Sequence, residues 1–134
     1  MVWPSNLRKN MNIQNILTSN VVDLTSLKEY FASDKDSLVQ LIGVYLSDTA
    51  PRIDILEENL TKVDYDSVKS ICHFLKSSFG LMGVNCIDEI AELEKQAQRN
   101  ESEDVIKERL NYILPICRES IIEYQLILDR LEAL

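Results

Sequence analysis

The sequence has little of what tight turns and sheets require. Its 134 residues include only three glycines and three prolines, too few for the many turns of an all-β fold. Hydrophobic residues make up 46% of the chain, which is enough for a core and more than disordered chains contain. This length fits one domain of ordinary size. We expect one helical domain, because leucine, isoleucine, glutamate, lysine and serine dominate the composition.

Long hydrophobic runs and an excess of basic residues are also lacking. No stretch approaches the roughly 20 apolar residues of a membrane span, and the first residues do not show the charged-then-apolar pattern of a signal peptide. Fourteen basic residues against 22 acidic ones give a formal charge of -8, and no basic run exceeds Arg8-Lys9. Binders of nucleic acid or anionic membranes normally carry a basic patch. We therefore expect a cytoplasmic protein with no nucleic-acid or membrane partner.

Cysteine is sparse as well. Cys72, Cys86 and Cys117 are widely spaced and form no CxxC pair, so they indicate neither a disulfide framework nor a zinc site. Each lies in a stretch with apolar periodicity. We expect each to be a small core residue, which suits a reducing compartment.

Apolar residues recur at steps of three or four along most of the chain, a spacing that predicts helices. The pattern places helices at about 22–31, 35–63, 64–81, 85–97 and 102–131, with bends at Pro51 and Pro115. Two helices in place of one bent helix over 35–63 are the alternative. Candidate N-caps are Asp23, Ser33 or Asp34, Asp64, Asn85 and Ser102. Short connections predict an all-α fold: an antiparallel helical bundle with a four-helix core and a short N-terminal helix.

Residues 1–21 are only weakly patterned, so we expect the bundle to occupy residues 22–134. A short amphipathic turn or two in the first segment can cover one end of the domain, and a loose tail is the alternative. The apolar residues available for such a turn are Leu7, Met11, Ile13, Ile16 and Leu17.

The only histidine, His73, lies on a helix face opposite to the apolar one. On a helical wheel, the residues within about 60° of it are Lys69, Lys76, Ser77 and Gly80. A neutral, exposed imidazole keeps a free nucleophilic nitrogen and can form covalent intermediates. Lysines favour an incoming phosphoryl group, and small neighbours leave room for a macromolecular partner. The alternative is a solvated surface histidine without function.

The stretch His73-Phe74-Leu75-Lys76-Ser77-Ser78-Phe79-Gly80-Leu81-Met82-Gly83 resembles the signature of histidine-containing phosphotransfer (HPt) domains. That signature is a histidine, a lysine three residues on, a small residue four on, and glycine or small residues seven and ten on. The length from Val22 to the carboxyl end and the position on the third main helix also fit the family. Position 77 is usually glycine in the family, and serine there is a mild departure.

The resemblance implies a phosphorelay intermediate with no ATP binding and no turnover of its own. His73 would accept a phosphoryl group from an aspartyl phosphate on a receiver domain, with a hybrid histidine kinase upstream, and pass it to the receiver of a response regulator. Lys76 would stabilise the phosphate. The docking surface would include Lys69, Phe74, Ser77 and Gly80. Lys95 or Gln96 of the following helix would approach the histidine. No cofactor or metal is implied here, because Mg²⁺ would belong to the receiver.

Two other interpretations remain at this point. A non-catalytic adaptor would dock receivers without phosphotransfer, although the intact His73 and Lys76 argue against it. An ordinary enzyme has little support, since one exposed histidine has no oriented carboxylate or pocket in the pattern. Phe74 fits a docking residue and a peripheral core residue equally well. We expect a monomer, because one bundle accounts for every apolar stripe.

Overall fold

The computed structural model describes residues 13–134. One helical turn at 13–16 precedes the main helices, which are α2 (Thr25–Phe31), α3 (Lys35–Glu58), α4 (Tyr65–Met82), α5 (Ile87–Gln98) and α6 (Glu103–Glu132). Over the described range, the only β pairing is an isolated antiparallel bridge between Val22 and Val84. The all-α bundle expected from periodicity is confirmed.

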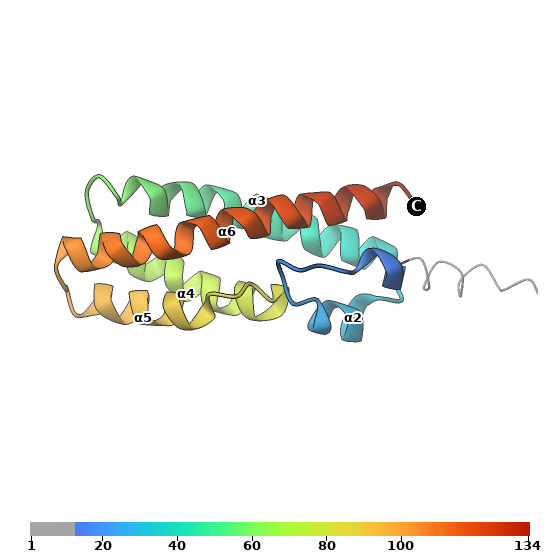
Figure 1. The fold of residues 1–134 in the computed structure, drawn as a ribbon, viewed down its shortest axis with the longest axis horizontal. Coiled ribbons are helices and arrows are strands. Elements are labelled where there is room, and N and C mark those ends of the chain that lie inside the picture. The colour runs from blue at the N-terminus through green and yellow to red at the C-terminus, as the bar shows by residue number, and fades with distance from the viewer. Residues whose placement is uncertain (1–12) are drawn as a thin grey trace, which may run out of the picture.

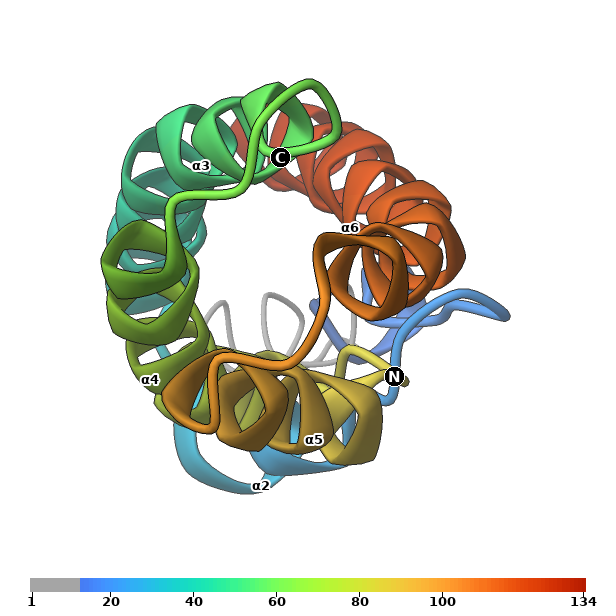
Figure 2. The same ribbon diagram turned by 90° about the vertical axis from the view of Figure 1, so that its left-hand side faces the viewer.

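Helices α3, α4, α5 and α6 surround a common core as a four-membered ring (Figure 2). The two longest helices, α3 and α6, lie together along the length of the molecule, and the shorter α4 and α5 lie together beneath them (Figure 1). At 1.5 Å per residue, α6 extends about 45 Å and α5 about 18 Å. Helix α2 and the segment before it fill the space that the shorter pair leaves (Figure 1).

Side-chain caps fix several helix starts. Asp34, Asp64 and Ser102 each accept a hydrogen bond from a backbone N–H three residues on, as expected of N-caps. Asp23 lies one residue before the N-cap position, but its carboxylate still accepts from the N–H of Thr25.

Helix α2 begins at Thr25 rather than at 22, and two further expected boundaries are wrong. Helix α5 begins at Ile87 with Cys86 at the N-cap position and no side-chain cap, rather than with Asn85 as its cap. The helix begins later than an Asn85 cap requires, because the backbone of Cys86 is not helical, with φ -149° and ψ 25°. Helix α3 ends at Glu58 instead of 63, because the buried Asn59 bonds the carbonyl of Ile55 and accepts from the N–H of Asp64.

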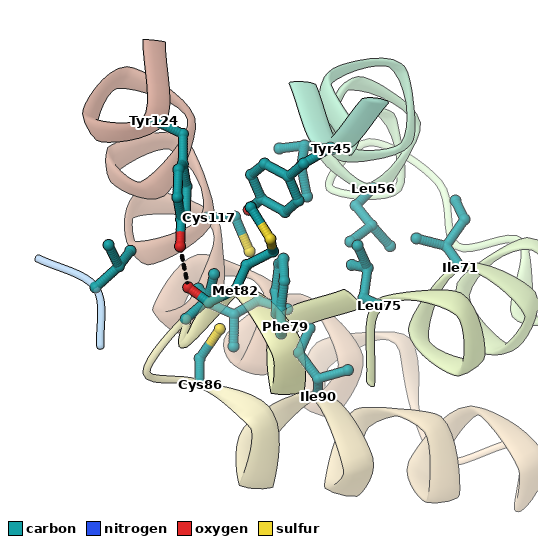
Figure 3. Packing of buried hydrophobic residues seen from close by; sticks show 14 of the residues in the cluster. Tyr45, Leu56, Ile71, Leu75, Phe79, Met82, Cys86, Ile90, Cys117 and Tyr124 are labelled. Atoms are coloured by element: carbon teal, nitrogen blue, oxygen red, sulfur yellow. Dashed lines mark hydrogen bonds between the residues drawn. The ribbon is translucent and has the colours of Figure 1, made fainter. Parts of the chain in front are cut away.

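One apolar cluster fills the bundle, and aromatic rings lie at its centre (Figure 3). The ring of Tyr45 lies 6.5 Å from that of Phe79 and 5.1 Å from that of Tyr124, measured between centroids. Both buried phenols have partners: Tyr45 pairs with the Ser120 hydroxyl at 2.8 Å, and Tyr124 donates to the carbonyl of Met82. The three cysteines are free and buried, as expected.

A backbone hydrogen bond joins the segment before α2 to the turn between α4 and α5. Ile13 and Leu17 are 1% and 0% exposed, so this part of the terminal segment packs in the core of the bundle. Residues 1–12, including Leu7 and Met11, lie outside the described residues. The Asp23 N–H donates to the carbonyl of Gly83 at 2.9 Å. The close approach requires glycine, because Gly83 has a φ of 65° and a Cβ there would overlap the Asp23 carbonyl oxygen.

We predict that Gly83→Ala lowers the free energy of unfolding by about 2–3 kcal/mol, since alanine would combine a left-handed backbone with a steric clash. Gly43→Ala is the matched control, because its Cβ would meet nothing within 4 Å inside α3. That variant should be more stable by about 0.5–1 kcal/mol. Urea unfolding measures both values. Equal stability of the two variants would contradict the close approach at Gly83.

Candidate functional site

Helix α4 presents His73 to solvent on a rigid support. Its opposite face is buried through Val68, Ile71, Cys72, Leu75, Phe79 and Met82. The His73 side chain is 78% exposed, as the helical wheel predicts. The neighbouring thiol does not compete as a nucleophile, because burial raises the pKa of Cys72 to about 12.

A carboxylate from α5 contacts both the histidine and the lysine one turn on. Glu94 Oε2 lies 3.2 Å from His73 Nδ1, and Glu94 Oε1 lies 2.6 Å from Lys76 Nζ. The Glu94 side chain is only 16% exposed, in the groove between α4 and α5. This single side chain therefore fixes the positions of the two residues that the motif singled out.

The expected contact of Lys95 or Gln96 with His73 is not formed. Lys95 is exposed, and Gln96 is buried beside α6 with Val105 and Tyr112. Around α5, Glu94 and Gln96 lie on opposite edges of the apolar stripe formed by Ile90, Leu93 and Ala97. Glu94 borders α4, and Gln96 borders α6. The sequence signal that would have found Glu94 is its position at i+4 from Ile90, on the edge of that stripe.

The ionisation of Glu94 follows from its partners. Burial by itself raises the pKa of this carboxyl, but the hydrogen bonds and charges of Lys76 and His73 outweigh it and hold the pKa below its ordinary value. An ionised carboxylate can only accept hydrogen bonds. His73 Nδ1 must then carry a proton, and in the neutral imidazole this leaves the lone pair on Nε2, the other ring nitrogen of this exposed side chain.

The small and basic neighbours of His73 leave the surface open. Ser77 and Gly80 are exposed, and a Cβ at Gly80 would meet nothing within 4 Å. Packing inside the bundle therefore does not require glycine at position 80. Lys69 is exposed and pairs with Asp66 of its own helix at 3.6 Å.

Phe74 lies at the edge of the core, next to the histidine. It is half-buried against the core, and it also lines a shallow cleft beside the histidine with Lys76, Ser77, Ser78 and Leu81. The guanidinium of Arg52, from α3, lies 3.8 Å from the centroid of its ring. Sequence reasoning missed Arg52, because the contact joins two helices.

Two further features bear on the site. Across residues 13–134, no group of three histidine, cysteine or acidic side chains is placed to hold a metal ion. None of the helices in that range combines the length and the apolar character needed to span a membrane.

Comparison with known proteins identifies one similarity. A family model described as Hpt domain matches residues 40–134, which cover most of the chain, including the stretch from His73 to Gly83. No curated protein and no solved structure matches the chain.

We predict that Glu94→Gln destabilises the protein by about 0.5–1 kcal/mol at neutral pH, a modest value because solvent screens the pair. The folded-state pKa of Glu94 is lowered, so its stabilisation is complete above the unfolded-state pKa of about 4.3 and disappears as the pH falls through the folded-state value. The difference between wild type and variant should therefore vanish in strong acid.

Urea unfolding across this pH range measures the difference. Glu92→Gln is the control, because Glu92 lies on the same helix and makes no ion pair or side-chain hydrogen bond within the described residues. A stability difference that is independent of pH would contradict the role of the Glu94 charge.

Proposed function

The chain belongs to the Hpt domain family, whose members transfer phosphoryl groups through a histidine in phosphorelays, and on this premise we propose that His73 is the residue phosphorylated here. In this proposal, the group comes from an aspartyl phosphate on the receiver domain of a hybrid histidine kinase. It then passes to the receiver domain of a response regulator.

The observation that carries the proposal is the bond between His73 Nδ1 and Glu94 at 3.2 Å. It directs the Nε2 lone pair away from the protein, on a side chain that is 78% exposed. In the transfer, Nε2 attacks the phosphorus, the bond between phosphorus and the aspartyl oxygen breaks, and the aspartate leaves as a carboxylate. Phosphorylation at Nε2 makes the ring cationic while Nδ1 keeps its proton. The Glu94 carboxylate offsets that charge.

Lys76 is placed to respond to the new negative charge. Its Nζ lies 2.6 Å from Glu94 and its side chain is 37% exposed, so it can turn from the carboxylate toward a phosphoryl oxygen. An ammonium group one helical turn from Nε2 favours the phosphohistidine without blocking the in-line approach of a donor. Ser77 and Gly80 keep the surface low for the receiver.

The remaining features of the proposal follow from a carrier role. The chain would have no turnover of its own and would bind no ATP or other cofactor, and the Mg²⁺ needed for aspartyl phosphate chemistry would be held by the receiver. It would act as a cytoplasmic monomer whose partners are receiver domains.

We predict that a receiver domain radiolabelled on its aspartate passes the label to this protein, and that His73→Gln abolishes the transfer. The label should be labile in acid and stable in base, as expected of phosphohistidine. If receivers bind both the wild type and His73→Gln but label neither, the protein is an adaptor and the proposal is wrong.

We also predict that Glu94→Gln slows the transfer about tenfold, the effect of losing one charged hydrogen bond worth about 1.4 kcal/mol. Glu92→Gln should transfer at the wild-type rate. NMR of the ¹⁵N-labelled imidazole should place the phosphoryl group on Nε2 and the proton on Nδ1. Phosphorylation at Nδ1 would contradict the orientation that Glu94 gives to the ring.

A further inference from the structure

Arg52 is a cation held in place beside the site without an acidic partner. Its Nη1 donates to the backbone carbonyl of Asp48 at 2.6 Å, and its guanidinium lies over the ring of Phe74. No ion pair among residues 13–134 includes Arg52, whereas Arg118, also half-buried, pairs with both Asp54 and Glu57. Arg52 is therefore oriented, partly desolvated, and has hydrogen-bond donors left over.

The apolar surface next to Arg52 is continuous with the histidine. The cleft beside His73 shares Phe74, Ser78 and Leu81 with a second, largely apolar hollow. That hollow extends to α3, where its walls include Leu41, Val44 and Asp48. Val44 is 50% exposed. Val44, Asp48 and Arg52 follow one another at i+4 steps on α3, so they form one row along the border with α4.

We propose that this row selects the partner: Arg52, held by Phe74, binds a carboxylate of the receiver domain, while the hollow between Val44 and Leu81 takes an apolar side chain beside it. This inference rests on the proposed function, which supplies the receiver. The occupant is a receiver surface that carries an acidic residue next to an apolar one.

Charge supports this assignment. The chain carries a formal charge of -8, which repels an acidic partner at long range. A positioned cation next to the nucleophile is therefore the feature that can attract an acidic residue of the partner at short range. Stacking on an aromatic ring limits the rotamers of the guanidinium, so less side-chain entropy is lost when it binds a carboxylate. The carboxylate of Asp48, one turn before Arg52, makes no ion pair among the described residues. It restricts the position of an incoming acid to the Arg52 side of the row.

The test measures phosphoryl transfer to His73 from two kinds of donor. One is a panel of receiver domains phosphorylated on aspartate, and the other is phosphoramidate, a small donor that needs no docking. Arg52→Gln should lower kcat/KM for the receiver about tenfold through KM, weaken its dependence on salt, and leave the rate with phosphoramidate unchanged. Arg52→Lys keeps the charge and should retain most of the salt dependence.

Arg130→Gln is the control, since it removes an exposed arginine from the last turn of α6. It should match the wild type with both donors. The inference is overturned if Arg52→Gln takes label from receivers at the wild-type rate. It is also overturned if Arg52→Gln loses as much rate with phosphoramidate as with receivers, because Arg52 would then only support the structure of the site. If the wild type reacts with phosphoramidate but with no receiver, the proposed function fails instead.

Discussion

The site depends on one carboxylate. Glu94 contacts His73 Nδ1 through one oxygen and Lys76 Nζ through the other, so a single side chain sets the tautomer of the imidazole and the position of the nearest cation. Its own location depends on the turn after α4. Gly83 adopts the left-handed conformation there, and α5 then runs back along α4, where it presents Glu94 to His73.

An exposed nucleophile and a fixed geometry ordinarily conflict, because exposed side chains sample several rotamers. In the structure, one set of contacts fixes the backbone of His73 and a different contact orients its side chain. The buried face of α4 holds the backbone of His73 in place, and one acceptor on the neighbouring helix orients the ring. Within residues 13–134 the His73 side chain remains 78% exposed, so the ring stays accessible from solvent.

The sequence predicted what depends on periodicity within one helix. The exposed and buried faces of α4, and the caps at Asp64 and Ser102, follow from residue spacing and short-range hydrogen bonds. It did not predict contacts between helices. Naming Lys95 or Gln96 in place of Glu94 is an error of one or two residues, yet each step along a helix rotates the side chain by about 100°. The stacking of Arg52 on Phe74 likewise depends on how α3 and α4 lie together.

The distribution of charge at the site fits the proposed carrier role. The Glu94 carboxylate and the Lys76 ammonium group balance each other beside the His73 ring. In the proposed phosphorylated state, Lys76 would turn toward the phosphoryl group, whose charge is negative, and Glu94 would keep its contact with the cationic ring of His73. Under the proposed function, the phosphoryl group would stay on an exposed side chain, open to transfer to a second receiver. Deep burial with dedicated cations would hold the phosphate more tightly and impair that second step.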